Sequence, residues 1–156
     1  MNRVIATTLM ASLFIATSCG GGEGMSKIDQ IKEQTKMVPA DPYENWKSNH
    51  GIGPISAFEL PAEIDMELAA SGQQVYEAKC TACHKTEKKF IGPSPKGLLQ
   101  RRTPAWIMNM ILNPEEMVQK DPMAKKLLME YNGSPMANQN LTKEEARAVL
   151  EYFRTL

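Results

Sequence analysis

The second half of the chain carries apolar residues at helical spacing. From residue 66 onward they recur three and four positions apart, as in Ala146, Val149 and Phe153. No segment alternates apolar and polar residues as a half-buried strand does. The pattern predicts an all-α domain over residues 62–156, with about four helices.

Capping residues mark where these helices begin. Thr103 and Asp121 are predicted N-caps that each precede a proline, and Thr142 is predicted to form a capping box with Glu145. Asn113–Pro114 is expected to end the helix that follows Thr103. The helices are expected over residues 66–79, 104–112, 122 to about 132, and from 142 onward. They supply few large apolar side chains, so the core is marginal unless something else fills it.

The segment before the helices has the composition of a linker. Prolines exclude a regular helix between residues 39 and 61; they stand at positions 39, 42, 54 and 61. Trp46, Ile52 and Phe58 are apolar enough for this stretch to lie across the folded domain. We therefore expect residues 19–61 to form a linker that is partly ordered at its C-terminal end.

The N-terminus has the features of an export signal over residues 1–18. Arg3 precedes an uncharged, mostly apolar stretch, Val4–Ala16, which is too short to span a bilayer. Ile15–Cys19 resembles a lipobox, so Cys19 is expected to become the acylated first residue of the mature protein; an ordinary secretory signal is the alternative. We expect an exported chain, lipid-anchored on the periplasmic side, with Gly20 favouring the outer over the inner membrane.

A C-x-x-C-H motif stands at Cys80–His84 and is the sequence of c-type haem attachment. Two thiols three positions apart at a helix end, Cys80 and Cys83, can each add to one vinyl group of the porphyrin. His84, next in sequence, then lies beneath the iron and offers it a ring nitrogen. The macrocycle would also fill the small core. We expect one covalently attached haem c.

Other chemistry is open to the same residues. A redox-active C-x-x-C pair is typical of a βαβ context, which the helical pattern does not offer. A structural zinc site needs four ligands, and only His50 could complete the set. A disulfide between Cys80 and Cys83 is a further alternative. A lipoprotein without haem, stabilised by zinc or a disulfide, therefore stays open.

Further motifs accompany C-x-x-C-H along the chain. They are Gly72-x-x-x-Tyr76-x-x-x-Cys80, Ile91-Gly92-Pro93, Gly97-Leu98, Arg101-Arg102, and Tyr152-Phe153 on the last helix. In this order, residues 66–156 resemble the class I cytochromes c, single-haem proteins with a histidine and a methionine ligand. The resemblance implies that Gly72 lets the first helix pack closely across the last one.

The resemblance also assigns residues around the haem. It implies that His84 is the proximal ligand and that the Pro93 carbonyl accepts the second N–H of its ring. Arg101 and Arg102 are expected to neutralise the haem propionates, and Trp106 to be buried near the same edge.

Met136 is expected to be the sixth ligand, because its loop resembles the methionine loop of the family. Other methionines are rivals, since methionine is also a common core residue. Met108, Met110 and Met129 lie on predicted helices and are expected to be buried as packing residues. Weaker rivals are Met117, Met123 and, from the proline-rich segment, His50.

A haem with both axial positions occupied favours one-electron transfer over substrate chemistry. We therefore expect a membrane-tethered, monomeric, single-haem electron carrier, which is not an enzyme. It is expected to work between respiratory complexes and a terminal reductase or oxidase. A haem protein with an open sixth position, which binds a gas or acts as an enzyme, is the alternative.

Charge is balanced overall and uneven along the chain. The 156 residues carry 18 basic and 18 acidic side chains, and a net charge of zero argues against a nucleic-acid partner. Residues 79–102 hold seven basic and one acidic side chain, a net charge of +6. Their lysines are Lys79, Lys85, Lys88, Lys89 and Lys96. These lysines either form a solvated surface or surround the haem edge and steer it toward redox partners with an acidic docking face.

Overall fold

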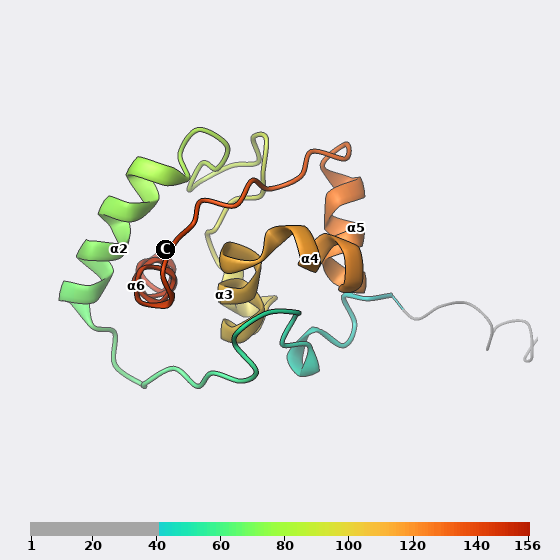
Figure 1. Cartoon of the computed structure of the whole chain (residues 1–156). Helices are drawn as coiled ribbons and strands as arrows, with labels where there is room; N and C mark the ends of the chain where they lie inside the picture. The colour runs from blue at the N-terminus through green and yellow to red at the C-terminus, as the bar shows by residue number, and fades with distance from the viewer. Residues whose placement is uncertain (1–40) are drawn as a thin grey trace, which may run out of the picture. The chain divides into compact units, whose positions relative to one another are not determined.

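The computed structural model describes residues 41–156, so the predicted signal segment and Cys19 lie outside the described residues. Within this range the structure contains five α-helices, two short 3-10 helices and no strand (Figure 1). In chain order they are η1 (Trp46–Ser48), α2 (Met66–Lys79), η2 (Leu98–Gln100), α3 (Pro104–Leu112), α4 (Pro114–Lys120), α5 (Pro122–Glu130) and α6 (Lys143–Phe153). The predicted all-α fold is confirmed.

The predicted N-caps are all present. The Thr103 side chain accepts a hydrogen bond from the Trp106 N–H, and the Asp121 side chain accepts one from the Ala124 N–H. Thr142 and Glu145 form both hydrogen bonds of a capping box. As a result, α3, α5 and α6 begin at the residues that the sequence indicates.

Asn113–Pro114 begins a helix as well as ending one. Asn113 is the C-cap of α3 and the N-cap of α4, and Pro114 occupies the first turn of α4. Proline loses no hydrogen bond at a helix start, because the N–H it lacks has no partner within the helix there. The expectation of about four helices is therefore one helix short.

Helices α2 and α6 cross in close contact at Gly72 (Figure 1). A Cβ at this position would lie 1.9 Å from the Ala148 carbonyl oxygen, so no larger residue fits. Further along α2, the Tyr76 ring packs against Tyr152 and Phe153, with ring centroids 5.4 and 5.7 Å apart. The crossing confirms the close packing predicted for Gly72. It also fixes the end of α2, from which the C-x-x-C-H motif follows.

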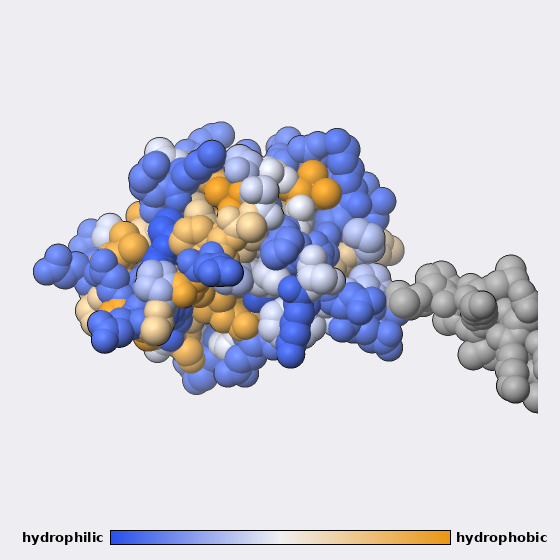
Figure 2. Space-filling view, turned by 90° about the horizontal axis from the view of Figure 1, so that it is seen from below, coloured by the Kyte–Doolittle hydropathy of each residue, from blue (hydrophilic) through white to orange (hydrophobic). Residues whose placement is uncertain are grey.

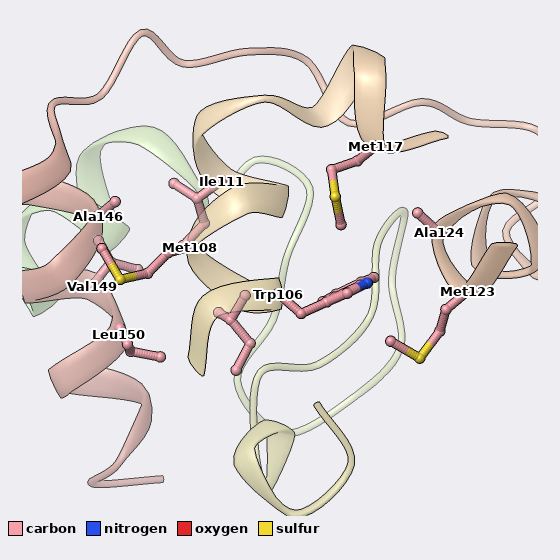
Figure 3. Close-up of a cluster of buried hydrophobic side chains, with 10 residues drawn as sticks. Trp106, Met108, Ile111, Met117, Met123, Ala124, Ala146, Val149 and Leu150 are labelled. Atoms are coloured by element: carbon pink, nitrogen blue, oxygen red, sulfur yellow. The ribbon is translucent and has the colours of Figure 1, made fainter. Parts of the chain in front are cut away.

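Helix α3 provides the centre of the hydrophobic core. Ile107 and Met108 are buried against α6, whose Val149 and Leu150 are fully buried. Figure 3 shows the α6 side chains on one side of α3 and the methionines of α4 and α5 on the other side. The Trp106 side chain extends from α3 toward this second group, so one helix holds both halves of the core together.

Residues 41–60, which we call the strap, run along this core. The strap is attached to α3 through the fully buried Asn109. Asn109 Nδ2 donates to the carbonyl oxygens of His50 (2.9 Å) and Ile55 (2.8 Å), and Asn109 Oδ1 accepts from the Ile55 N–H (3.0 Å). All of residues 41–156 belong to one compact unit, which therefore includes residues that the sequence pattern assigned to the linker. Figure 2 shows the molecule from below, with apolar residues gathered in the middle of this face and polar residues around them.

A buried carboxylate joins the segment after the strap to α6. Glu151 is fully buried, and its Oε1 accepts from the Asp65 N–H (2.8 Å) and from Arg154 Nη1 (2.7 Å). Arg147 pairs with the other oxygen. Arg154 also donates to the Pro61 carbonyl oxygen (2.7 Å). Because the buried charge is paired on both oxygens, it holds the chain in place where it enters α2.

Candidate haem site

The C-x-x-C-H motif forms one further turn after α2. Cys80 is the C-cap of α2, and its N–H donates to the Tyr76 carbonyl oxygen at 2.8 Å. The N–H groups of Cys83 and His84 both donate to the Cys80 carbonyl oxygen, at 3.1 and 2.9 Å. This turn brings Cys80, Cys83 and His84 to the wall of one cavity. Three side chains from a stretch of five residues therefore face the same cavity.

The Cys80 thiol lacks the lowered pKa that is typical of a redox-active pair. Cys80 and Cys83 are not joined to each other in a disulfide. Burial, and after it the neighbouring Cys83, raises the pKa of the Cys80 thiol to about 11. Redox-active C-x-x-C pairs have a lowered thiol pKa instead. Residues 41–156 also contain no group of three His, Cys, Asp or Glu side chains that could hold a metal ion, so the zinc alternative gains no support from them.

The cavity has mostly apolar walls, which come from every part of the helical domain. Ile91 lines it from the loop after the motif and Leu98 from η2. Ile107 and Met110 line it from α3, Leu127 from α5 and Phe153 from α6. The loop between α5 and α6 closes the remaining side through Ser134–Ala137. A flat apolar macrocycle fits such walls, and its burial supplies the core that the side chains alone do not provide.

The geometry around His84 fixes the orientation of its imidazole ring. Nδ1 lies 2.8 Å from the Pro93 carbonyl oxygen. A carbonyl can only accept a hydrogen bond, so Nδ1 carries the proton and Nε2 keeps its lone pair for a metal ion. A Cβ at Gly92 would lie 2.4 Å from His84 Cε1, so the ring packs directly on the backbone of this glycine. The structure thus brings together His84 and Pro93 as the resemblance implied.

Two methionines line the cavity. Met136 is half-buried in the loop that follows α5, and Met110 lies on α3. Met117 and Met123 are fully buried outside the cavity wall, and the sulfur of Met117 accepts a hydrogen bond from the Ile52 N–H at 3.0 Å. Met117 and Met123, the two weaker candidates for the sixth ligand, are therefore packing residues of the core.

The other rivals also lie away from the cavity wall. Met108 is buried in the core, as expected. The expectation that Met129 is buried is wrong, because its side chain is 74% exposed on the outer face of α5. His50 does not line the cavity, and its carbonyl oxygen accepts a hydrogen bond from Asn109.

Arg101 and Arg102 both line the cavity, and they differ in their partners. Arg101 donates to the carbonyl oxygens of Lys96 (2.9 Å) and Ser94 (2.8 Å). Arg102 is only 7% exposed, and its Nε has no hydrogen-bond partner among the described residues. Burial lowers the pKa of Arg102. No carboxylate within residues 41–156 forms an ion pair with it, so a ligand with an anionic group fits this place.

Trp106 lines the cavity and is 2% exposed. Its Nε1–H donates to Asp121 Oδ1 at 3.0 Å, and Asp121 Oδ2 accepts from Asn49 Nδ2 at 2.6 Å. The same carboxylate caps α5. Asp121 therefore ties the cavity wall to α5 and to the strap. The sequence shows Asp121 as a cap, but it gives no sign of its contacts with Trp106 and Asn49.

The residues present fit a haem of the c type. Two thiols three positions apart line the cavity, a ring nitrogen is held toward it, and a thioether and a buried guanidinium lie on its walls. An all-α fold around such a cavity defines a c-type haem protein. The chain belongs to the cytochrome c family, because the family model named Cytochrome c matches residues 69–156. Members of the family bind one covalently attached haem c, which is therefore the cofactor.

Solved structures agree with this assignment. The chain is 44% identical to a cytochrome c from Rhodothermus marinus, with a TM-score of 0.63 over 66% of this chain and 88% of the other. It is 43% identical to an engineered cytochrome c from the same organism, with a TM-score of 0.63 over 66% and 89% of the two chains. It is 29% identical to the cytochrome c domain of a Pseudomonas putida protein, with a TM-score of 0.50 over 54% and 85%. A search of the curated proteins finds no match.

These comparisons confirm the resemblance to class I cytochromes c. A cytochrome c domain with such relatives indicates a haem electron carrier, and domains of this family are typically exported to the periplasmic or extracellular side. The matched region begins within α2, so the strap lies outside it.

Proposed function

We propose that the chain is a membrane-tethered carrier of single electrons between respiratory complexes and a terminal reductase or oxidase, with His84 and Met136 as the axial ligands. The observation that carries the proposal is the placement of both side chains on the wall of one apolar cavity, from segments far apart in the sequence. When bound, the haem supplies one-electron redox chemistry, and a thioether ligand raises its reduction potential.

The residues of this chain have three tasks in such a carrier. Pro93 and Gly92 hold the His84 ring in one tautomer and one orientation. The apolar walls would keep water away from the bound haem, so that few solvent dipoles have to reorient when an electron is transferred. With Met136 holding the iron as well as His84, no coordination position would be left open for a substrate or a gas. Carbon monoxide binding by the reduced protein tests this arrangement.

Part of the lysine cluster supports docking to an acidic partner. Lys79 lies at the cavity, and Lys88 is exposed in the loop after the motif. Lys96 Nζ lies 2.6 Å from Glu87 Oε2, and both side chains are exposed. The two opposite charges cancel, so Lys96 adds little to the positive charge of the cluster. The remaining lysines, Lys79, Lys85, Lys88 and Lys89, lie within five residues of the attachment motif in sequence, and they would give this part of the surface a positive charge.

Steering by this field gives a measurable salt dependence. The second-order rate of oxidation by ferricyanide, an anion, is expected to fall as ionic strength rises, whereas the rate with a cationic cobalt complex rises. Lys88→Glu is expected to slow the ferricyanide reaction by about tenfold at low ionic strength. Lys125→Glu, a change on the exposed side of α5 away from the cavity wall, is the matched control. Stopped-flow rates that are independent of salt and of Lys88 would contradict the steering.

The tether is proposed on Cys19, which follows the export signal, and on the glycine-rich residues 20–24. Within residues 41–156 no helix is long and apolar enough to cross a bilayer. Wild-type protein is expected in the membrane fraction with a fatty-acyl label on Cys19, and at the density of outer membrane. Cys19→Ala is expected to lose the label and to leave the membrane fraction. Unlabelled wild-type protein, or a Cys19→Ala protein that stays with the membrane, would contradict the lipid anchor.

A further inference from the structure

Two carboxylates are buried within residues 41–156, and they differ in how their charge is balanced. Glu151 is fully buried and pairs with Arg147 and Arg154. Asp121, between α4 and α5, is 3% exposed and forms no ion pair with a Lys, Arg or His side chain of this part of the chain. The negative charge of Asp121 is therefore not neutralised by a basic partner of its own.

Three N–H groups hold the Asp121 carboxylate instead. Oδ1 accepts from Trp106 Nε1 at 3.0 Å and from the Ala124 N–H at 2.7 Å. Oδ2 accepts from Asn49 Nδ2 at 2.6 Å. Both oxygens act only as acceptors, as the oxygens of an ionised carboxylate do. Asp121 is also the N-cap of α5, and the N-terminus of a helix favours a negative charge. Dipoles thus stabilise the charge, and no opposite charge cancels it.

The strap keeps this arrangement in place through Asn49. Asn49 Oδ1 accepts from the Gly51 N–H at 2.7 Å, so the orientation of the amide is fixed and its Nδ2 is the group that faces Asp121. The Asn49 carbonyl oxygen accepts from the Thr103 hydroxyl at 2.6 Å, which ties the strap to the start of α3. Asn49 lies outside the region 69–156 that the family model matches. The strap therefore contributes a side chain to the surroundings of Asp121.

Trp106 stands between Asp121 and the haem cavity. The Trp106 side chain is 2% exposed and lines the cavity, and its indole nitrogen points toward α5 (Figure 3). Only one side chain separates the carboxylate from the cavity, and both groups are buried, so water screens the field of the charge little. The Arg102 guanidinium lies 5.2 Å from the centre of the Trp106 ring. Asp121 thus also offsets a positive charge on the same wall.

We propose that Asp121 is a positioning residue that lowers the reduction potential of the haem, by fixing Trp106 in the cavity wall and by placing a buried negative charge behind it. Loss of an electron adds one positive charge to the haem, and a fixed negative charge nearby stabilises that oxidised state. Groups outside the ligand set are known to tune haem potentials in this way. The proposal rests on the haem assignment and is independent of which side chain is the sixth ligand.

The test is a spectroelectrochemical titration of the full chain loaded with haem. In Asp121→Asn the midpoint potential is expected to rise, with a change of about tenfold in the equilibrium constant against a reference couple, or about 59 mV for one electron. The red thioether–iron absorption band is expected to stay as in wild type, so the result does not depend on the Met136 assignment. Glu115→Gln is the matched control, because it removes the same charge from the exposed side of α4. The control is expected to keep the wild-type potential, because solvent screens Glu115.

A second variant separates the charge from the packing. Asp121→Asn places an amide NH2 against the amide of Asn49, whereas Asn49→Asp combined with Asp121→Asn restores a donor facing an acceptor. The combined variant keeps the carboxylate and moves it one residue further from Trp106. The Tm is expected to stay within a few degrees of wild type, and the potential to lie between those of wild type and Asp121→Asn. An unchanged potential in Asp121→Asn, or a wild-type potential in the combined variant, would overturn the proposal.

Discussion

Replacing Met136 by alanine abolishes the thioether–iron absorption band at the red end of the visible spectrum and lowers the reduction potential. Met136 lines the cavity from a loop and is half-buried, whereas Met117 is fully buried and its sulfur accepts a hydrogen bond from the Ile52 N–H. Thioether ligation raises the potential of haem iron, and axial ligation spans roughly 0.8 V across haem proteins. The potential of Met136→Ala is expected to fall by a substantial part of that range, as measured by spectroelectrochemical titration.

Met110→Leu is the matched control for this prediction. Met110 lines the same cavity from α3, and leucine nearly conserves its volume, so the packing cost is small. The variant is expected to keep both the red band and the wild-type potential. If Met110→Leu lost the band while Met136→Ala kept it, Met110 would be the ligand and the assignment of Met136 would be wrong.

Substituting Gly72 by alanine destabilises the holoprotein more than any surface change on the same helix. The added Cβ would lie 1.9 Å from the Ala148 carbonyl oxygen and 2.7 Å from the Val149 nitrogen, which are backbone atoms that cannot rotate aside. Helices α2 and α6 must therefore separate, at a cost of about 3 kcal/mol in the free energy of unfolding. This cost corresponds to a fall in Tm of about 12 °C or more for a domain of this size.

Ser71→Ala, on the exposed side of α2, is the control for Gly72→Ala. Thermal unfolding followed at the haem band is expected to leave its Tm within a few degrees of wild type. Equal Tm values for the two variants would mean that the helix crossing has room for a side chain at position 72. That result would contradict the close packing of Gly72 against Ala148.

Local rules predict the helices and the attachment motif well. The caps at Thr103, Asp121 and Thr142 act through neighbours within three residues, so the sequence shows them directly. Cys80–His84 is informative for the same reason, because its chemistry depends on spacing within one turn. Asn113–Pro114 predicts only the end of α3 and not the start of α4, because a proline that ends one helix can equally begin the next.

Contacts between distant segments are beyond such rules. Asn109 bonds to backbone atoms more than fifty positions earlier, and nothing near it in the sequence marks that role. Asp121 shows its cap but not its hydrogen bond to Trp106. Helical spacing places Met110 and Met129 on helices without saying which faces the cavity, and the structure puts Met110 on its wall and Met129 in solvent.

Carbon monoxide binding by the reduced wild-type protein tests the central claim most directly. If His84 and Met136 occupy both axial positions, the absorption spectrum of the reduced protein at neutral pH does not change when the solution is saturated with the gas. Met136→Ala, measured beside it, is expected to form the carbon monoxide adduct. A wild-type protein that forms the adduct as readily as this variant has an open sixth position, and that result would contradict a closed, electron-carrying haem.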